Sequence, residues 1–391
     1  MTFAEEEIVA LRRTLHAHPE IGLDLPRTQR ILIDALSEQK LETTLGTRLS
    51  SITGVLRGGK PGPTVLLRAD MDGLPIVEAT GLPFASTNGA MHACGHDLHM
   101  AGLVGAAKIL AERRAELPGN VIFMFQPGEE GSAGGRIMIE EGVLDAAGER
   151  PVAAYAMHVD CGTESGLFVT RPGPIMSSAS GLELRVNGTG GHAALPHLLV
   201  DPVPVAAEIV LAFQSFVARR VPVGDPAVVS VTRLNTNSGA SNVMPSAVEI
   251  KANIRTLSRE TLKLVREELP KLARAIGQAH GCTVDAEFID SYPVTHNDPA
   301  ETAAVLEQLG DRAQLLPHPG MASEDFAYVL EEIPGTLVFL GARPAGVDPH
   351  DQPAMHSALA TFDDGVLGAQ AATLAELAWR RLHRPPEAQT A

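Results

Sequence analysis

The sequence predicts an α/β domain built on a mixed sheet, with an inserted ferredoxin-like α+β domain. Short apolar runs between turn signals, typical of buried strands, occur at 64–68, 121–125 and 153–157, and a helical pattern at 100–114 separates the first two. After about residue 180 the pattern changes to strands and helices in the order β-α-β-β-α-β. Acidic or imidazole side chains follow the three apolar runs, as is typical of sites at the carboxyl edge of a parallel sheet.

The elements of the first part of the chain follow from apolar spacing and from proline positions. Ile8, Leu11 and Leu15 recur at a helical period, and Pro26 stands where a first-turn proline belongs in a second helix. We expect helices at 5–15, 27–36 and 100–114, and strands at 41–44, 54–57, 64–68, 121–125 and 153–157.

The inserted domain and the remaining elements follow from the same patterns. In the inserted domain we expect strands at 182–186, 227–232, 246–256 and 282–289 and helices at 201–219 and 260–280. Helices at 301–309 and 363–382 and a strand at 336–340 then complete the first domain. The predicted boundaries are 1–179 and 293–391 for the α/β domain and 180–292 for the insertion.

The composition of the chain indicates which kinds of binding partner and which cell compartment to expect. Acidic residues outnumber basic ones by 47 to 31, and the formal charge of −16 argues against binding to nucleic acid or to an anionic membrane. No apolar run approaches transmembrane length, and the N-terminus does not resemble a signal peptide. Three widely spaced cysteines do not suggest a disulfide framework, and a thiol that serves as a ligand must stay reduced, so we expect a cytoplasmic protein.

The stretch Met91–Met100 concentrates three histidines, a cysteine and an aspartate ahead of a helix. Thiolate, imidazole and carboxylate are the ligands that borderline divalent metals prefer. Cys94 and His96 cannot share a helix face, so they would converge from a loop in which Gly95 relaxes the backbone. Taken alone, a polar turn with a buried thiol explains the stretch equally well.

Other candidate ligands follow the predicted strands. Asp70, Glu129, Glu130 and His158 all fall at expected strand ends. Scattered surface acids would not follow strand ends in this way, so we expect these side chains to meet the Cys94/His96 turn at one edge of the sheet.

A series of motifs covers nearly the whole chain in a familiar order. They are His16–Glu20, Arg68–Pro75, Met91–His99, Phe125–Gly131, Gly190–His197, Asn242–Pro245, Met321–Phe326 and Met355–Ser357. Together they resemble the hippurate hydrolase/N-acyl-amino-acid amidohydrolase family, a branch of the dinuclear metallopeptidases. Arg68 stands where the wider superfamily has a ligating histidine, and Cys94 with His96 suits the amidohydrolase branch.

The resemblance implies a set of metal ligands and a general acid/base. The implied ligands are Cys94, His96, Glu130, His158 and His356, with Cys94 bridging two ions and Glu129 as the acid/base. Physical chemistry agrees, since a thiolate can span two cations and five ligands can hold two divalent ions about 3.5–4 Å apart. Zinc, manganese, nickel and cobalt all remain candidates. Asp70 and Asp72 are expected behind the ligands, where they would orient them.

The remaining candidates concern the substrate. The resemblance makes His192 the donor to the tetrahedral oxyanion, reaching another subunit's site, and extends the same role more weakly to Asn242. Arg255 could clamp a substrate carboxylate, although an ordinary solvated arginine fits its position as well. Ser323, Glu324 and Asp325 are expected to line the substrate cleft.

We therefore expect a dinuclear metal-dependent amidohydrolase, or aminoacylase, that cleaves the amide of an N-acyl amino acid of N-acetyl or N-benzoyl type. The rival with the same chemistry is a dipeptidase or carboxypeptidase, and a rival of another class is a non-catalytic binding protein on this scaffold. We also expect a homodimer or higher homo-oligomer formed through the inserted domain.

Overall fold

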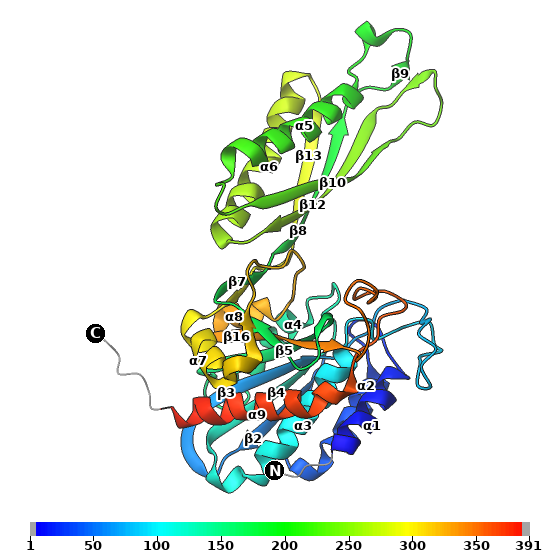
Figure 1. The fold of residues 1–391 in the computed structure, drawn as a ribbon. Helices are drawn as coiled ribbons and strands as arrows, with labels where there is room; N and C mark the ends of the chain where they lie inside the picture. Colours follow the sequence, from blue (N-terminus) through cyan, green and yellow to red (C-terminus); the bar gives the residue numbers. More distant parts are fainter. Residues whose placement is uncertain (1–4, 385–391) are drawn as a thin grey trace, which may run out of the picture. The chain divides into compact units, whose positions relative to one another are not determined.

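The computed structural model describes residues 5–384 and confirms the predicted fold class (Figure 1). The chain packs as two compact units. The main unit comprises the chain up to Ile175, His296–His318 and the chain from Asp325 onward, and the inserted unit comprises Met176–Thr295 with Pro319–Glu324. The expected insertion, 180–292, lies inside the longer of these inserted segments.

The main unit is built on one eight-stranded mixed sheet in the order β1-β2-β4-β3-β5-β16-β6-β15. The central neighbours β3/β4, β3/β5 and β5/β16 are parallel, whereas β1/β2, β2/β4 and β16/β6 are antiparallel. The strands are β1 (Glu42–Leu45), β2 (Ile52–Arg57), β3 (Lys60–Asp70), β4 (Pro118–Gln126), β5 (Ala153–Glu164), β6 (Phe168–Thr170), β15 (Ala313–Leu315) and β16 (Gly335–Arg343). A separate two-stranded pair joins β7 (Gly173–Met176) and β14 (Thr295–Asn297).

Helices α3 and α9 pack on the central strands and on each other. α3 is buried along nearly its whole length, which its Ala/Gly/Leu-rich sequence allows. At Gly105 a Cβ atom would stand 2.6 Å from Cβ of Ala371, so glycine permits the close approach of the two helices. The helices of this unit are α1 (Glu5–His16), α2 (Pro26–Ala35), α3 (His96–Glu112), α4 (Gly134–Glu140), α7 (Pro299–Leu309), α8 (Ala327–Glu332) and α9 (Leu367–His383).

One expectation about strand ends is wrong. β3 ends at Asp70 and β4 at Gln126, close to the predicted ends, but β5 continues to Glu164, so His158 lies within a strand. β5 continues because β16 keeps pairing with it, with Phe339 opposite His158, after its pairing with β3 has stopped at Ala156. His158 nevertheless lies beyond Ala156, the last residue of β5 that pairs with β3. It therefore lies at the same edge of the sheet as Asp70.

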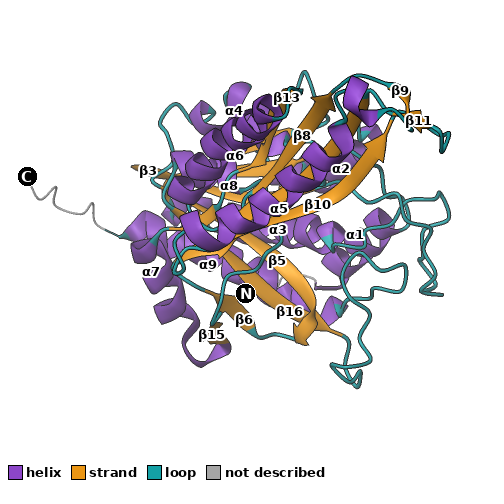
Figure 2. Cartoon of the chain, turned by 90° about the horizontal axis from the view of Figure 1, so that it is seen from above, coloured by secondary structure: helices purple, strands orange, loops and turns teal. Residues whose placement is uncertain are grey.

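The inserted unit has the predicted β-α-β-β-α-β order. Its strands form an antiparallel sheet in the order β10-β12-β8-β13, and α5 and α6 lie side by side against it (Figure 2). A two-stranded ribbon joins β9 to β11. The elements are β8 (Ala179–Asn187), β9 (Gly191–His192), α5 (Pro202–Arg220), β10 (Ala227–Thr236), β11 (Val243–Met244), β12 (Ala247–Thr256), α6 (Arg259–Ala279) and β13 (Thr283–Tyr292).

By length and composition α5 could span a membrane, contrary to our expectation that no stretch approaches that length. In this structure it is a packed helix, because Val205, Ile209, Phe213 and Phe216 are buried in the core of the inserted unit. The core helix of a globular domain passes the same test, so α5 carries no argument for a membrane.

Candidate metal centre

The thiol of Cys94 stands at the centre of a cluster of possible ligands in the main unit. Its Sγ atom lies 3.5 Å from Nε2 of His158 and 3.2 Å from Nε2 of His356. Two triads with all ligand atoms within 4.8 Å share this thiol, one completed by His96 and His158 and the other by Glu130 and His356. The structure thus brings all five predicted ligands together, with Cys94 in the place of a shared ligand.

Gly95 and His356 show how the backbone adapts to gather these groups. Gly95 precedes α3 with φ +84°, and a Cβ atom there would stand 2.3 Å from Cγ2 of Val159, so only glycine fits. His356 has φ 65°, an uncommon conformation for a residue with a side chain, and its N–H donates to the carbonyl of Ala93 at 3.0 Å. Such strain at non-glycine residues concentrates at functional sites.

The ring nitrogens of the buried histidines are arranged for metal binding through Nε2. Nδ1 of His96 lies 2.8 Å from the carbonyl oxygen of Asp72, and Nδ1 of His158 lies 2.8 Å from that of Val159. A carbonyl only accepts, so each Nδ1 carries the hydrogen and each Nε2 presents a lone pair. Within residues 5–384, Nε2 of His96 is buried and has no hydrogen-bond partner. A buried acceptor of this kind beside a thiol and a carboxylate fits the coordination of a cation.

Electrostatics hold His158 and Glu130 in the forms that bind a cation, whereas at His96 the neighbouring acids favour a positive charge, which a proton or a metal ion can supply. Burial lowers the pKa of His158 well below its usual value, which keeps its imidazole neutral. Burial opposes ionisation of Glu130, but the hydrogen bond from His356 and the charge of His96 outweigh it and lower the pKa of Glu130. Burial also opposes a charge on His96, yet the attraction of Asp70 and Asp72 raises its pKa. The same acids would raise the basicity of His96 toward a metal.

The acids behind the cluster take up defined positions. Oδ1 of Asp70 receives Nδ1–H of His99 at 2.6 Å, and its Oδ2 receives Nη1 of Arg68 at 2.6 Å. Nε2 of His99 accepts from the N–H of Val159 at 2.8 Å. His99 therefore has both nitrogens occupied and supports the peptide that orients His158. Burial opposes charge on Asp70, but His96, His99 and Arg68 lower its pKa well below the usual value.

Glu129 and Asp72 complete the centre. Glu129 is buried, and its carboxylate forms a group with His96 and Glu130 in which all ligand atoms lie within 4.8 Å of one another. Asp72 accepts hydrogen bonds from the backbone N–H groups of both Glu129 and Glu130. Burial raises the pKa of Asp72 to about 6, although the charge of His96 opposes the shift.

The predicted substrate residues lie in the inserted unit. His192 is exposed on β9 opposite Val243, and the neighbouring Ala193 donates its N–H to the carbonyl of Asn242 at 3.1 Å. Arg255 on β12 donates Nη1–H to Oγ of Ser323 at 3.1 Å, and burial lowers its pKa. Glu324 is buried, and its carbonyl accepts from the hydroxyl of Thr295 at 3.3 Å.

Sequence reasoning missed two buried partners of Arg68. Besides Asp70, its guanidinium binds Asp325 Oδ1 at 2.8 Å and Gln126 Oε1 at 2.9 Å, and Asp325 also receives the N–H of Gly135. The Met321–Phe326 motif led us to expect Asp325 in the substrate cleft, but nothing in the sequence indicated its pairing with Arg68. Arg68 therefore links Asp70, Gln126 and Asp325 in one buried hydrogen-bond network.

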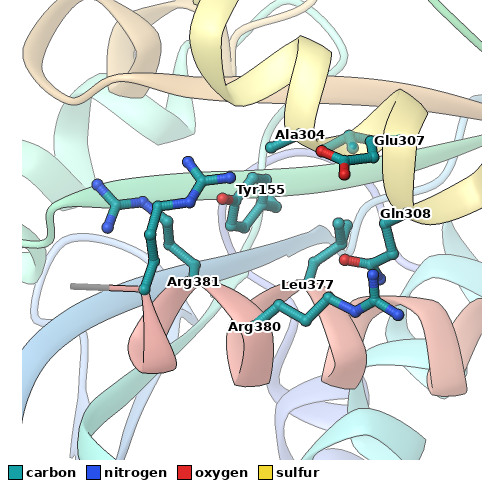
Figure 3. Close-up of a pocket in the computed structure, with 9 residues that line it drawn as sticks. Tyr155, Ala304, Glu307, Gln308, Leu377, Arg380 and Arg381 are labelled. Atoms are coloured by element: carbon teal, nitrogen blue, oxygen red, sulfur yellow. The ribbon is translucent and has the colours of Figure 1, made fainter. Parts of the chain in front are cut away.

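A separate surface pocket lies away from these residues (Figure 3). It encloses about 200 Å³, and its lining includes Tyr155, Gln308, Arg380 and Arg381. The hydroxyl of Tyr155 donates to Glu301 at 2.5 Å, and Arg381 donates to the other oxygen of Glu301 at 2.8 Å. No candidate site residue lines this pocket, so it has no part in the centre described above.

Fold and site place the chain among the metal-dependent hydrolases that act on amide bonds. The signature of peptidase family M20/M25/M40 matches residues 66–380, and the chain belongs to this family. It is 35% identical over 379 residues to N-acetylcysteine deacetylase of Bacillus subtilis, covering 95% of this chain and 96% of that relative. It is 34% identical over 345 residues to thermostable carboxypeptidase 1 of Saccharolobus solfataricus, covering 87% and 86% of the two chains.

A solved structure shares this architecture. It is a dinuclear metal-binding peptidase of the M20 family from Bacillus subtilis, with a TM-score of 0.83 and 31% sequence identity. The match covers 97% of this chain and 98% of that one.

Proposed function

We propose that this chain hydrolyses the amide bond of N-acyl amino acids and holds two divalent ions through Cys94, His96, Glu130, His158 and His356. The observation that carries the proposal is the placement of Glu129, a buried carboxylate beside His96 and Glu130. The cluster has five ligands and one further carboxylate, which matches the needs of metal-assisted hydrolysis. The dinuclear neighbour supports the count of two ions. Zinc, manganese, nickel and cobalt all suit the mixed thiolate, imidazole and carboxylate set.

The protein groups have separate tasks in this proposal. Bound divalent ions would supply Lewis-acid polarisation of the amide carbonyl and acidify a water molecule. Glu129 takes the proton of the attacking water and returns it to the leaving amine, so that the carboxylic acid and the amino acid depart. His192 stabilises the oxyanion, with Asn242 as a weaker candidate for the same task. Arg255 binds the substrate carboxylate, and Ser323 and Glu324 line the cleft.

We propose an N-acyl amino acid as the substrate because a deacetylase relative covers almost the full chain. The carboxypeptidase relative supports a second candidate with the same chemistry, the release of a C-terminal amino acid from a peptide. A non-catalytic binding protein would not require a buried carboxylate beside a complete ligand set.

Steady-state rates on matched substrates separate these candidates. N-acetyl and N-benzoyl derivatives of one amino acid should be compared with dipeptides that end in the same amino acid. We expect the larger kcat/KM for the N-acyl derivatives, with Glu129→Gln as the control for contaminating hydrolases. Faster cleavage of the dipeptides would select the peptidase, and inactivity of metal-loaded protein on every amide would select the binding protein.

A further inference from the structure

Asp72 touches three parts of the candidate centre at once. It follows the end of β3 and is 1% exposed. Its Oδ1 accepts the N–H of Glu129 at 2.9 Å, and its Oδ2 accepts the N–H of Glu130 at 3.1 Å. Its backbone carbonyl accepts Nδ1–H of His96 at 2.8 Å. The general acid/base and two ligands thus meet on a single residue.

The Glu129–Glu130 pair needs such an anchor because it belongs to no regular element. β4 ends at Gln126 and α4 begins at Gly134. The flanking Gly128 and Gly131 have φ values of +72° and +86°, so the backbone turns sharply on both sides of the pair. Side-chain acceptors commonly satisfy backbone N–H groups that lie outside helices and strands.

We infer that Asp72 is a positioning residue whose carboxylate fixes the two successive peptides of Glu129 and Glu130. Held in this way, the two side chains leave the backbone in different directions, one toward the reacting water and the other toward the metal. The carbonyl of Asp72 holds His96 in the tautomer that presents Nε2. The inference rests on the proposed function for the role of Glu129.

A carboxylate is required because it offers an acceptor oxygen to each N–H. An asparagine at this position would offer one oxygen and one NH2 group, and the NH2 group would face an N–H donor. Asp72→Asn therefore keeps the size of the side chain and removes one of the two anchors.

The test compares Asp72→Asn with Asp298→Asn. Asp298 is the control because a single carboxylate oxygen, Oδ1, accepts the backbone N–H groups of both Ala300 and Glu301 at the start of α7, so an asparagine there can keep both hydrogen bonds. Metal affinity is measured by chelator competition with zinc, and kcat and KM are measured on an N-acetyl amino acid at saturating zinc. Loss of a group that orients ligands typically lowers metal affinity or activity about 10–100-fold.

For Asp72→Asn we expect losses of that size in both zinc affinity and kcat, with a smaller change in KM. Asp298→Asn should leave both unchanged. Wild-type zinc affinity and wild-type kcat in folded Asp72→Asn would overturn the inference, as would a lowered melting temperature alone. If Asp72→Asn does not unfold cooperatively, Asp72→Glu replaces it. That variant keeps both oxygens but displaces them, and wild-type zinc affinity and kcat in it would equally contradict the inference.

This test separates the inference from the proposed function. If the wild-type chain cleaves no amide, the proposed function fails, and zinc affinity alone decides the role of Asp72.

Discussion

Glu129 and Glu130 are neighbours in the chain, but the structure gives them different surroundings. Oε1 of Glu130 lies 3.3 Å from Nε2 of His356, and Glu130 belongs to the triad with Cys94 and His356. Glu129 instead forms a group with His96 and Glu130. The role of each residue therefore depends on which atoms its carboxylate faces, and a substitution that removes only the charge can distinguish them.

Glu129→Gln should keep both metals and lose about a hundredfold to ten-thousandfold in kcat, because proton transfer contributes an effect of that size. Glu130→Gln is the contrasting variant, and it should lose metal because we propose its carboxylate as a ligand. Elemental analysis and kcat check both. Metal loss in Glu129→Gln, or a kcat near that of the wild type, would contradict the assignment.

The proximity of the five proposed ligands could be predicted from sequence, because Cys94 and His96 are close together in the chain and the other three lie in recognisable motifs. Among the supporting residues, Asp70 and Asp72 could be predicted, but the roles of His99 and Asp325 could not. His99 resembles any helix histidine until Asp70, 29 positions away, is seen to receive its Nδ1–H. Asp325 is paired with Arg68 across 257 positions. Contacts over such separations arise only when the sheet assembles.

At the scale of elements, α1 is joined to α3 by a buried charge network. Arg12 Nε and His16 Nδ1 each lie 2.7 Å from Oδ2 of Asp97, and Nε2 of His16 lies 3.1 Å from Glu78. Burial disfavours a charge on His16, but the charge and hydrogen bond of Asp97 outweigh it and raise the pKa of His16 to about 9. The network sits directly behind the first turn of α3, which carries His96.

This network predicts how stability depends on pH. Because the pKa of His16 is higher in the folded state than in the unfolded state, protonation of His16 stabilises the fold. This stabilisation is fully present below the unfolded pKa of 6.5 and is lost as pH rises through the folded pKa of about 9. The shift corresponds to roughly 3 kcal/mol. The difference in unfolding free energy between wild type and His16→Gln, measured in urea, should therefore shrink between about pH 6 and about pH 9.5.

His350→Gln, a substitution of the same kind at an exposed histidine outside this network, is measured in parallel as the control. A difference between wild type and His16→Gln that stays constant over the same range would show that His16 is not held as a cation.

Element boundaries were predictable where periodicity and turn residues coincide, as in α1, α2 and α6. The length of β5 was not, because its extension beyond residue 157 depends on pairing with β16, which lies far away in the sequence. The short α4 was missed for a similar reason, since its seven residues give too few turns for a period to emerge.

At the scale of the whole molecule, the inserted unit includes a second segment that the sequence did not indicate. Pro319–Glu324 belongs to it, and the N–H of Ser177 donates to the carbonyl of Gly320 at 3.1 Å. Ser323 and Glu324 therefore belong to the inserted unit, whereas the adjacent Asp325 belongs to the main unit. Hydrophobic patterns report burial within an element and do not report which unit a loop joins.

We propose that the chain forms a homodimer and that His192 serves the site of the partner chain. His192→Ala should lower kcat by about a hundredfold to a thousandfold, the effect of one lost oxyanion donor, without metal loss. Mixing His192→Ala chains with Glu129→Gln chains should then restore part of the activity, because each heterodimer contains one site built from intact halves. Absence of recovery in mixtures verified to contain heterodimers would assign His192 to its own chain or to no site.

Metal titration of the metal-free chain tests the central claim most directly. Hydrolysis of an N-acetyl amino acid and bound metal are measured together as zinc, manganese, nickel or cobalt is added stepwise. The account predicts no turnover without metal and a rise in activity that ends at two bound ions per chain. Full activity in the metal-free chain, or a wild-type chain that binds no divalent ion, would contradict it.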